Sequence, residues 1–242
     1  MRALRIGGVV PFTTTDYPGK LAAVLFLQGC PWRCGYCHNP HLHASRGERE
    51  HDWAQTLRWI ERRRGLLDAI VFSGGEPTSQ AALATAMRTV RLMGFAVGLH
   101  SGGAYPRRLA AVLPGVDWIG FDFKAPFGGY PALTGKDGSG AAAHASLDAV
   151  LASGVHNEIR TTVHPALTTP SDLVAMADAL AARGITDWVL QTFRATGCAN
   201  ESLVASAAGE ALDPALLARL AQKLRRSLLP AHPSPVPHRR SR

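Results

Sequence analysis

The chain lacks long apolar runs and has few cysteines. None of its apolar runs approaches the about 18 residues that a transmembrane helix requires, so we expect no membrane-spanning segment. Its first residues, Met-Arg-Ala-Leu-Arg-Ile-Gly-Gly, lack the apolar core of a secretory signal peptide. Four cysteines in 242 residues do not indicate the disulfide framework of a secreted domain. We therefore expect a protein of the cytoplasm.

Acidic residues are also scarce, and the resulting positive charge is unevenly distributed. The chain has 26 Lys and Arg against 18 Asp and Glu, a formal charge of +8. Residues 219–242 contain seven of these cations and no acid, which leaves +1 for residues 1–218. Charge gathered at one end is typical of a solvated tail rather than of a nucleic-acid groove. We predict one domain over residues 1–228, a disordered Pro-rich basic tail over 229–242 and no nucleic-acid partner.

Short apolar segments alternate with helical patterns along most of the chain. The connections are long enough for crossover helices, which predicts parallel strands. Residues 6–20, with Pro18 and Gly19, indicate an irregular lead-in loop. The predicted strands are 21–28, 68–72, 95–99, 117–123, 158–163 and 188–192, and the predicted helices are 53–64, 80–93, 105–113, 142–153, 171–183 and 214–228.

Six such units fit either a doubly wound sheet or an open barrel. No G-x-G-x-x-G sequence follows the first predicted strand, which counts against a dinucleotide-binding sheet. We therefore predict an α/β fold, an incomplete (β/α)6 barrel that is open on one side.

Three cysteines, Cys30, Cys34 and Cys37, follow the first predicted strand at a C-x3-C-x2-C spacing. An iron–sulfur cube is normally held by four thiolates, so a loop with three leaves one iron open. An open iron beside a ligand is what a reactive cluster requires. A zinc site would need a fourth ligand, for which His38 and Cys198 are candidates. A disulfide with a spare thiol is a further alternative, but we favour the cluster.

Polar or glycine-rich segments accompany the later predicted strands. In barrels of this kind the working residues cluster at the carboxyl ends of the strands, so we expect these segments to meet. The paired glycines at 74 and 75 would let the backbone approach a ligand closely. A ligand carboxylate would find Lys124 or Arg160, and a ligand amine would meet the open iron and the paired glycines. The segments are Ser73–Pro77, His100–Gly103, Asp122–Lys124, Glu158–Arg160 and Gln191–Arg194.

These motifs resemble a known superfamily. The spacing of the three cysteines, with Tyr36 before the last, resembles the radical S-adenosylmethionine (SAM) superfamily, and Gly74-Gly75-Glu76-Pro77 is similar to its second motif. Cys37-His38-Asn39-Pro40, preceded by Asp16-Tyr17-Pro18-Gly19, resembles the activating enzymes of glycyl radical enzymes. Other segments resemble the branch of anaerobic ribonucleoside-triphosphate reductase activating proteins, namely Gly8–Phe12, Asp122–Pro126, Leu133–Gly135, Arg160–Val163 and Gln191–Arg194.

The resemblance, which covers roughly residues 6–200, implies a [4Fe–4S] cluster on Cys30, Cys34 and Cys37, with SAM chelated at its open iron. One-electron reduction then cleaves SAM to methionine and a 5′-deoxyadenosyl radical, which takes a hydrogen from a glycine of a partner protein. The implied partner is a glycyl radical enzyme, in this branch the anaerobic ribonucleotide reductase. A flavodoxin or ferredoxin-type protein is the implied electron donor.

The resemblance also implies roles for individual residues. Tyr36 and His38 would lie beside the adenine and the cluster, and Gly74, Gly75 and the adjoining Glu76 would belong to the site for the methionine amino group. Lys124 would bind the carboxylate, and Arg160 the carboxylate or the ribose. The further cofactor-binding candidates are Ser101, Asp122 and Gln191.

Two features depart from the pattern or lie outside it. Relatives commonly have Asp-Thr-Asn-Gly where this chain has His100-Ser101-Gly102-Gly103, so a cation site with Asp122 loses one carboxylate. Cys198 is expected to be a free loop thiol.

Two other functions remain open. One is a radical SAM enzyme with a small-molecule substrate, and the other is a non-catalytic zinc or cluster module that docks partners through its basic tail.

Overall fold

A computed structural model describes residues 4–47, 51–206 and 213–226. Within these residues the backbone forms one seven-stranded sheet whose strands lie in sequence order from β1 to β7. The predicted tail over 229–242 lies outside the described residues, as does the end of the last predicted helix. None of the helices in the described part of the chain has the length and apolar content needed to cross a bilayer.

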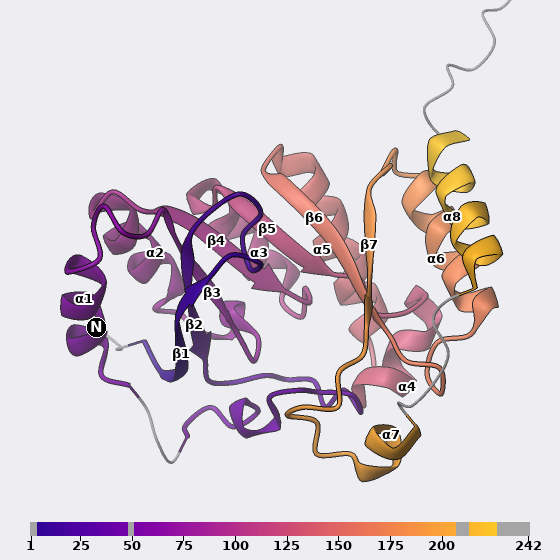
Figure 1. The fold of residues 1–242 in the computed structure, drawn as a ribbon, viewed down its shortest axis with the longest axis horizontal. Helices are drawn as coiled ribbons and strands as arrows, with labels where there is room; N and C mark the ends of the chain where they lie inside the picture. Colours follow the sequence, from indigo (N-terminus) through magenta and orange to yellow (C-terminus); the bar gives the residue numbers. More distant parts are fainter. Residues whose placement is uncertain (1–3, 48–50, 207–212, 227–242) are drawn as a thin grey trace, which may run out of the picture.

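The last six strands are parallel to one another and correspond to the predicted βα units. Because the edge strands β1 and β7 do not pair, the sheet stays open, and the prediction of an incomplete barrel is confirmed (Figure 1). The strands β2 to β5 are short and mostly buried, as is typical of parallel strands between layers, whereas β6 and β7 include polar and exposed residues. These strands are β2 (Ala22–Leu27), β3 (Ala69–Gly74), β4 (Ala96–Ser101), β5 (Trp118–Asp122), β6 (His156–Val163) and β7 (Trp188–Thr192).

The prediction of a lead-in loop over residues 6–20 is wrong in its first half. Ile6–Thr13 forms strand β1, which pairs antiparallel with β2. The paired glycines Gly7 and Gly8 and the proline Pro11 concealed the strand in the sequence, because all three weaken a strand pattern. An antiparallel strand at one edge extends the parallel sheet without closing it.

Helices connect the parallel strands, and most begin and end within a few residues of the predicted bounds. Two short helices were not predicted, α4 and α7, and the helix expected at 142–153 begins earlier, at Ser139. The helices are α1 (Trp53–Glu61), α2 (Leu83–Leu92), α3 (Pro106–Val112), α4 (Tyr130–Thr134), α5 (Ser139–Ser153), α6 (Pro170–Ala181), α7 (Glu201–Ser206) and α8 (Pro214–Arg226).

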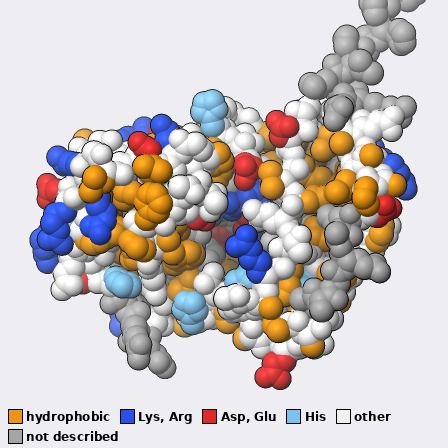
Figure 2. Space-filling model, viewed as in Figure 1, with side chains coloured by type: hydrophobic (Ala, Val, Ile, Leu, Met, Phe, Trp, Pro, Cys, Tyr) orange, Lys and Arg blue, Asp and Glu red, His pale blue; other side chains and the backbone are white. Residues whose placement is uncertain are grey.

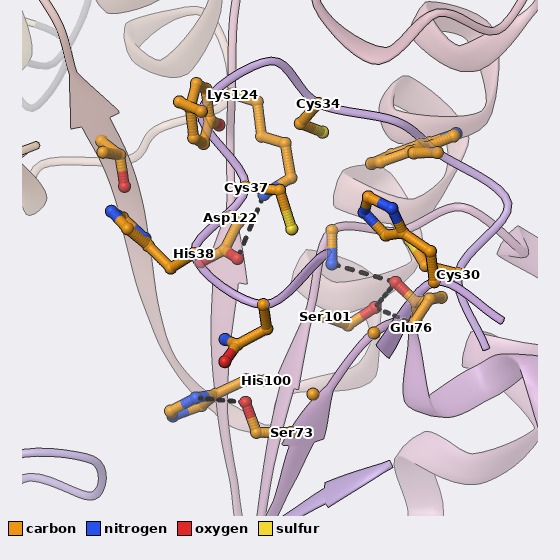
Figure 3. A pocket seen from close by; sticks show the side chains of 18 residues that line it. Cys30, Cys34, Cys37, His38, Ser73, Glu76, His100, Ser101, Asp122 and Lys124 are labelled. Atoms are coloured by element: carbon orange, nitrogen blue, oxygen red, sulfur yellow. Dashed lines mark hydrogen bonds and ion pairs between the residues drawn. The ribbon is translucent and has the colours of Figure 1, made fainter. Parts of the chain in front are cut away.

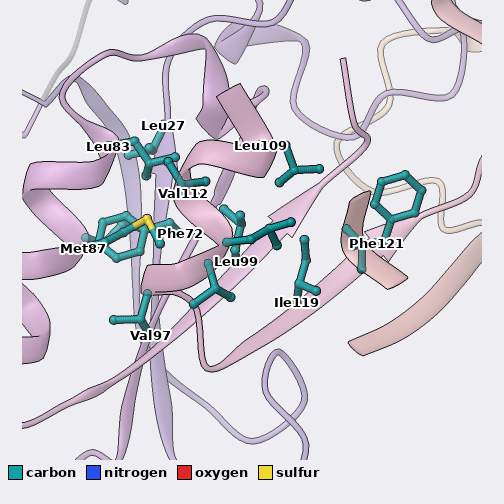
Figure 4. Packing of buried hydrophobic residues seen from close by; sticks show 14 of the residues in the cluster. Leu27, Phe72, Leu83, Met87, Val97, Leu99, Leu109, Val112, Ile119 and Phe121 are labelled. Atoms are coloured by element: carbon teal, nitrogen blue, oxygen red, sulfur yellow. The ribbon is translucent and has the colours of Figure 1, made fainter. Parts of the chain in front are cut away.

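The main core lies between the convex face of the sheet and the covering helices. Leu27, Phe72 and Leu99 project from neighbouring strands against Leu83 and Met87 of α2, and all five are buried (Figure 4). Burying one such side chain contributes roughly 1.5–3 kcal/mol, so this layer carries most of the stability.

A smaller apolar cluster fills the amino-terminal end of the concave face. Tyr17 stacks on Trp118 with ring centroids 5.0 Å apart, and both pack against Val71. Gly98 leaves room for this cluster, because a Cβ there would stand 2.9 Å from Cγ2 of Val71 and 3.1 Å from the Tyr17 ring. The cluster closes the barrel at the amino-terminal ends of the strands and leaves the carboxyl ends for polar residues.

Candidate functional site

A cavity of about 150 Å³ lies at the carboxyl ends of the strands (Figure 3). Its walls come from the cysteine loop after β2, the glycine loop after β3 and the ends of β4, β5 and β6. This is the face on which barrels of this kind carry their reactive groups. The predicted site residues that line it are Cys30, Cys34, Tyr36, Cys37, His38, Gly74, Gly75, Glu76, Ser101, Asp122 and Lys124.

Backbone hydrogen bonds hold the cysteine loop against two other segments. The N–H of Cys30 donates to the carbonyl of His43 at 3.1 Å, and the N–H of Arg33 donates to that of Thr134 at 2.7 Å. Trp32 is buried beneath the loop, edge-on to Tyr130, with ring centroids 5.8 Å apart. The three thiols therefore project from a fixed loop into one cavity.

All four cysteines are free thiols, so the disulfide alternative has no support. Burial raises the pKa of Cys30 to about 12 and also raises the pKa values of Cys34 and Cys37. Thiols in such surroundings keep their protons unless a cationic centre replaces them. Among the residues that the structure describes, no three His, Cys, Asp or Glu side chains converge on the position of one metal ion, which counts against a zinc site, whereas in a cube each thiolate binds a different iron.

The glycine loop lies flat against the start of the cysteine loop. Gly74 has φ of +115°, and a Cβ on Gly75 would stand 2.6 Å from the carbonyl oxygen of Gly29. The N–H groups of Gly75 and Glu76 already donate to the carbonyls of Leu27 and Gly29, at 2.9 and 2.8 Å. The loop can therefore offer a ligand acceptors rather than these two donors, which suits an amino group.

Glu76 ties the glycine loop to the end of β4. Its carboxylate is buried and accepts hydrogen bonds from the hydroxyl of Thr78 at 2.6 Å, the hydroxyl of Ser101 at 3.0 Å and the N–H of Gly102 at 3.1 Å. A carboxylate with this many donors holds its position firmly. Glu76 thus sets the spacing between two walls of the cavity.

Asp122 stands between two cations. Its carboxylate oxygens lie 3.3 Å from Nζ of Lys124 and 3.0 Å from Nη2 of Arg160. Burial alone would raise the pKa of Asp122, but Lys124 and Arg160 hold it well below its usual range. Burial alone would lower the pKa of Lys124, but Tyr36 and Asp122 raise it well above its usual value. Asp122 and Lys124 are therefore both charged at neutral pH, and together with the guanidinium of Arg160 the three groups carry a net charge of +1.

Tyr36 contributes a buried hydroxyl beside this trio. Nζ of Lys124 lies 5.8 Å from the centroid of the Tyr36 ring. The Tyr36 hydroxyl is buried and has no hydrogen-bond partner among the described residues. An unpaired buried hydroxyl costs free energy, so its presence in the cavity wall favours a ligand that pairs with it.

His100 lines the cavity, and the sequence reasoning gave it no role of its own. Its Nε2 lies 2.9 Å from the carbonyl oxygen of Asp16, and its Nδ1 lies 3.3 Å from the hydroxyl of Ser73. Burial and the nearby Arg160 lower the pKa of His100 to about 4. The neutral ring donates from Nε2 to Asp16 and accepts at Nδ1 from Ser73. The sequence signal for His100 was its position two residues after Gly98, because residues two apart on a strand face the same side of the sheet, here the concave face.

The remaining candidates lie at the margin of the cavity. His38 lines it, but Nε2 of His38 lies 2.8 Å from the carbonyl oxygen of Arg194, and its ring stacks on Phe193. Arg160 reaches the site through Asp122. Gln191 is exposed on β7 and does not line the cavity. The Cys198 thiol lies 3.8 Å from the carbonyl oxygen of Gly35, outside the cavity lining.

Two sequence relatives share part of this chain. A protein of Methanocaldococcus jannaschii, whose name assigns it to the glycyl-radical enzyme activating enzymes, is 36% identical over 135 residues. That match covers 54% of this chain and 54% of the relative, so it spans about half the length of each. The pyruvate formate-lyase-activating enzyme of Clostridium pasteurianum is 30% identical over 170 residues, which cover 68% of this chain and 70% of that enzyme.

Solved structures share the fold at low sequence identity. TYW1 with a lysine–pyruvate adduct bound has a TM-score of 0.61 at 16% identity, covering 88% of this chain and 76% of that one. Native anSMEcpe with bound S-adenosylmethionine has a TM-score of 0.56 at 14% identity, covering 69% of this chain and 49% of that one. The family model described as the radical SAM superfamily matches residues 24–192, which run from within β2 to the end of β7 and include the cysteine loop and the glycine loop. The chain therefore belongs to the radical SAM superfamily.

Proposed function

We propose that this chain is an activating enzyme that generates a glycyl radical on a partner enzyme. The proposal is carried by the cavity lined by three thiols, taken together with the two relatives. The names of these relatives describe the activation of glycyl radical enzymes and of pyruvate formate-lyase. We further propose the anaerobic ribonucleoside-triphosphate reductase as the partner, on the strength of the segments Asp122–Pro126 and Gln191–Arg194.

Radical SAM proteins use a [4Fe–4S] cluster and SAM, and the residues of this cavity fit both groups. Three free thiols from one loop supply three ligands to a cube and leave its fourth iron open. The partnerless Tyr36 hydroxyl and the net positive charge around Asp122 provide sites for a polar, carboxylate-bearing ligand. When bound and reduced, the cluster supplies the electron that cleaves SAM to methionine and a 5′-deoxyadenosyl radical.

The residues of this chain would position SAM rather than react with it. Cys30, Cys34 and Cys37 would hold the cluster. Lys124, already charged, would bind the SAM carboxylate, while carbonyl oxygens of the Gly74–Gly75 loop would accept from its amino group. Buried Trp32 beneath the cysteine loop would keep water from the base of the site.

Asp122, Arg160 and Glu76 would not contact SAM themselves but would position the groups that do. Asp122 orients Lys124 through the 3.3 Å ion pair, and Arg160 balances the carboxylate from the other side. Glu76 would keep the glycine loop and Ser101 at a fixed separation. The roles of His38 and Gln191 toward SAM stay predictions.

The test uses the full-length protein, reconstituted anaerobically with iron and sulfide. It is reduced with dithionite, supplied with SAM and mixed in turn with an anaerobic ribonucleotide reductase and a pyruvate formate-lyase. A glycine-centred EPR signal on the reductase alone supports the full proposal, and a signal on the lyase alone overturns the choice of partner. 5′-Deoxyadenosine without a glycyl signal on either enzyme favours a small-molecule substrate.

A further inference from the structure

The two edges of the sheet differ in how well they are protected against pairing. β1, at one edge, contains Pro11, which has no N–H to donate, and its pairing with β2 shifts register twice. Its first residue, Ile6, accepts a hydrogen bond at 2.8 Å from the N–H of His51. Prolines, bulges and covering segments are the devices by which proteins keep an edge strand from pairing with other chains.

In the part of the chain that the structure describes, β7, at the other edge, has none of these devices. Its sequence, Trp-Val-Leu-Gln-Thr, contains no charge, proline or glycine, and it pairs with β6 in regular register over five residues. Among the described residues, no strand pairs with its outer edge. An edge of this kind is a template for another extended chain.

The hydrogen-bond pattern identifies the groups on the free edge. The N–H of Phe193 donates to the carbonyl of Val163 at 3.0 Å, so Phe193 faces β6. Because successive residues of a strand direct their backbone groups to opposite edges, Val189 and Gln191 also face β6. The N–H and C=O groups of Leu190 and Thr192 therefore face outward.

A groove with both polar and apolar walls lies beside this edge, between β7 and helix α8. It has a volume of about 440 Å³, and Leu217 of α8, at its border, is 40% exposed. Figure 1 shows α8 packed on α6 on the far side of β7, and Figure 2 shows hydrophobic side chains gathered over this part of the surface. Thr186 and the carboxylate of Asp187 line one end of the groove, and its apolar lining residues are Trp188, Leu190, Leu217, Leu220, Ala221 and Leu224.

The opposite face of β7 leads toward the catalytic cavity. Val189 is 37% exposed and Gln191 is exposed, both on the concave face. Gln191 is in register with Thr162 of β6, and Thr162 lines the cavity that holds the three thiols. An extended chain along β7 would therefore pass from the α8 groove to the border of the site.

We infer that the free edge of β7 binds an extended segment of the partner protein by strand addition. Backbone groups of that segment pair with Leu190 and Thr192, and its alternate apolar side chains enter the groove under α8. The segment is the one that adjoins the substrate glycine, because the path along β7 ends at the cavity. This inference rests on the proposed function, since it requires a peptide substrate.

The test measures amide hydrogen exchange of β7 in the full-length reconstituted protein. The probe is an acetylated and amidated heptapeptide, Val-Thr-Val-Gly-Val-Thr-Val, which alternates apolar side chains around a glycine. We expect it to slow exchange of the Leu190 and Thr192 amides by about tenfold or more, with no change in β1. The control peptide is N-methylated on all seven backbone amides, so it keeps the side chains but has no backbone N–H to donate along either edge, and it should have no effect.

Two variants distinguish strand addition at β7 from nonspecific binding of the peptide to exposed apolar residues. Leu217→Asp places a carboxylate at the border of the groove without touching the sheet and should abolish the slowed exchange. Leu92→Asp, at an apolar residue of α2 that is 82% exposed, is the matched control and should leave the effect intact. Both variants should form 5′-deoxyadenosine at the rate of the parent protein when no peptide is present.

Several results would overturn the inference. These are unchanged exchange with the peptide, equal slowing by the N-methylated control, and persistence of the effect in Leu217→Asp. Slow exchange of the outward-facing amides of Leu190 and Thr192 without peptide would show that another part of this chain, or, if it disappears on dilution, a second copy, holds the edge. Loss of 5′-deoxyadenosine in the parent protein, with peptide protection intact, would instead count against the proposed function.

Discussion

Nζ of Lys124 lies 3.3 Å from the carboxylate of Asp122, which accepts from Arg160 at its other oxygen. One carboxylate thus orients two cations, and the surplus positive charge remains in the cavity. The arrangement explains how a lysine with little exposure can stay charged and still bind a carboxylate of a ligand.

Lys124→Ala should weaken SAM binding by about tenfold or more, since a charge-assisted hydrogen bond contributes about 1.5–3 kcal/mol. Asp122 keeps Arg160 as its partner, so the fold and the iron content should not change. Isothermal titration of SAM under anaerobic conditions measures the effect. Lys136→Ala, at an exposed lysine, is the control. Equal SAM affinity in the two variants would reassign Lys124 to a purely structural ion pair.

Replacing Cys30, Cys34 or Cys37 by Ala should each abolish the cluster, because every one is a required thiolate from the same loop. Cys198→Ala should retain it, since the Cys198 thiol does not line the cavity. Iron and sulfide content and the visible absorption after reconstitution provide the measurement. Loss of the cluster in Cys198→Ala would show that four cysteines, not three, hold it.

Gly75→Ala should destabilise the protein, because the added Cβ would stand 2.6 Å from the carbonyl oxygen of Gly29 and would push the glycine loop from the cysteine loop. A steric clash of this kind costs about 1–3 kcal/mol. Gly128→Ala is a matched control, since no atom lies within 4 Å of its Cβ position. Urea unfolding of both variants measures the difference. Equal midpoints would mean that the two loops separate without cost.

The sequence predicted the architecture well wherever the spacing of apolar residues and the positions of the glycines indicate the same elements. The six parallel strands and the convergence of Cys30, Gly74 and Lys124 at one end follow from βα alternation alone. Strand β1 was missed because Gly7, Gly8 and Pro11 oppose the strand pattern, and pairing with β2 overrides their preference. The role of His100 could not be predicted, because its partner Asp16 is 84 residues away and contributes a backbone carbonyl.

The pH dependence of stability should show the contribution of His100. Its pKa falls from 6.5 to about 4 on folding, so between these values the unfolded chain binds the additional proton. Stability should therefore rise with pH across this window, by up to about 1.4 kcal/mol per pH unit from this group. Urea midpoints at pH 4.5 to 7 for the parent protein and His100→Gln measure it. The same slope in both proteins would exclude His100 as the source.

Formation of 5′-deoxyadenosine by the reduced, reconstituted protein tests the central claim most directly. With full iron and sulfide content, dithionite and SAM, we expect 5′-deoxyadenosine and a changed EPR signal of the reduced cluster when SAM is added. Both should be absent in the Cys34→Ala variant. A protein with full iron and sulfide that yields neither would contradict the account, since the cavity would then hold a cluster without radical chemistry.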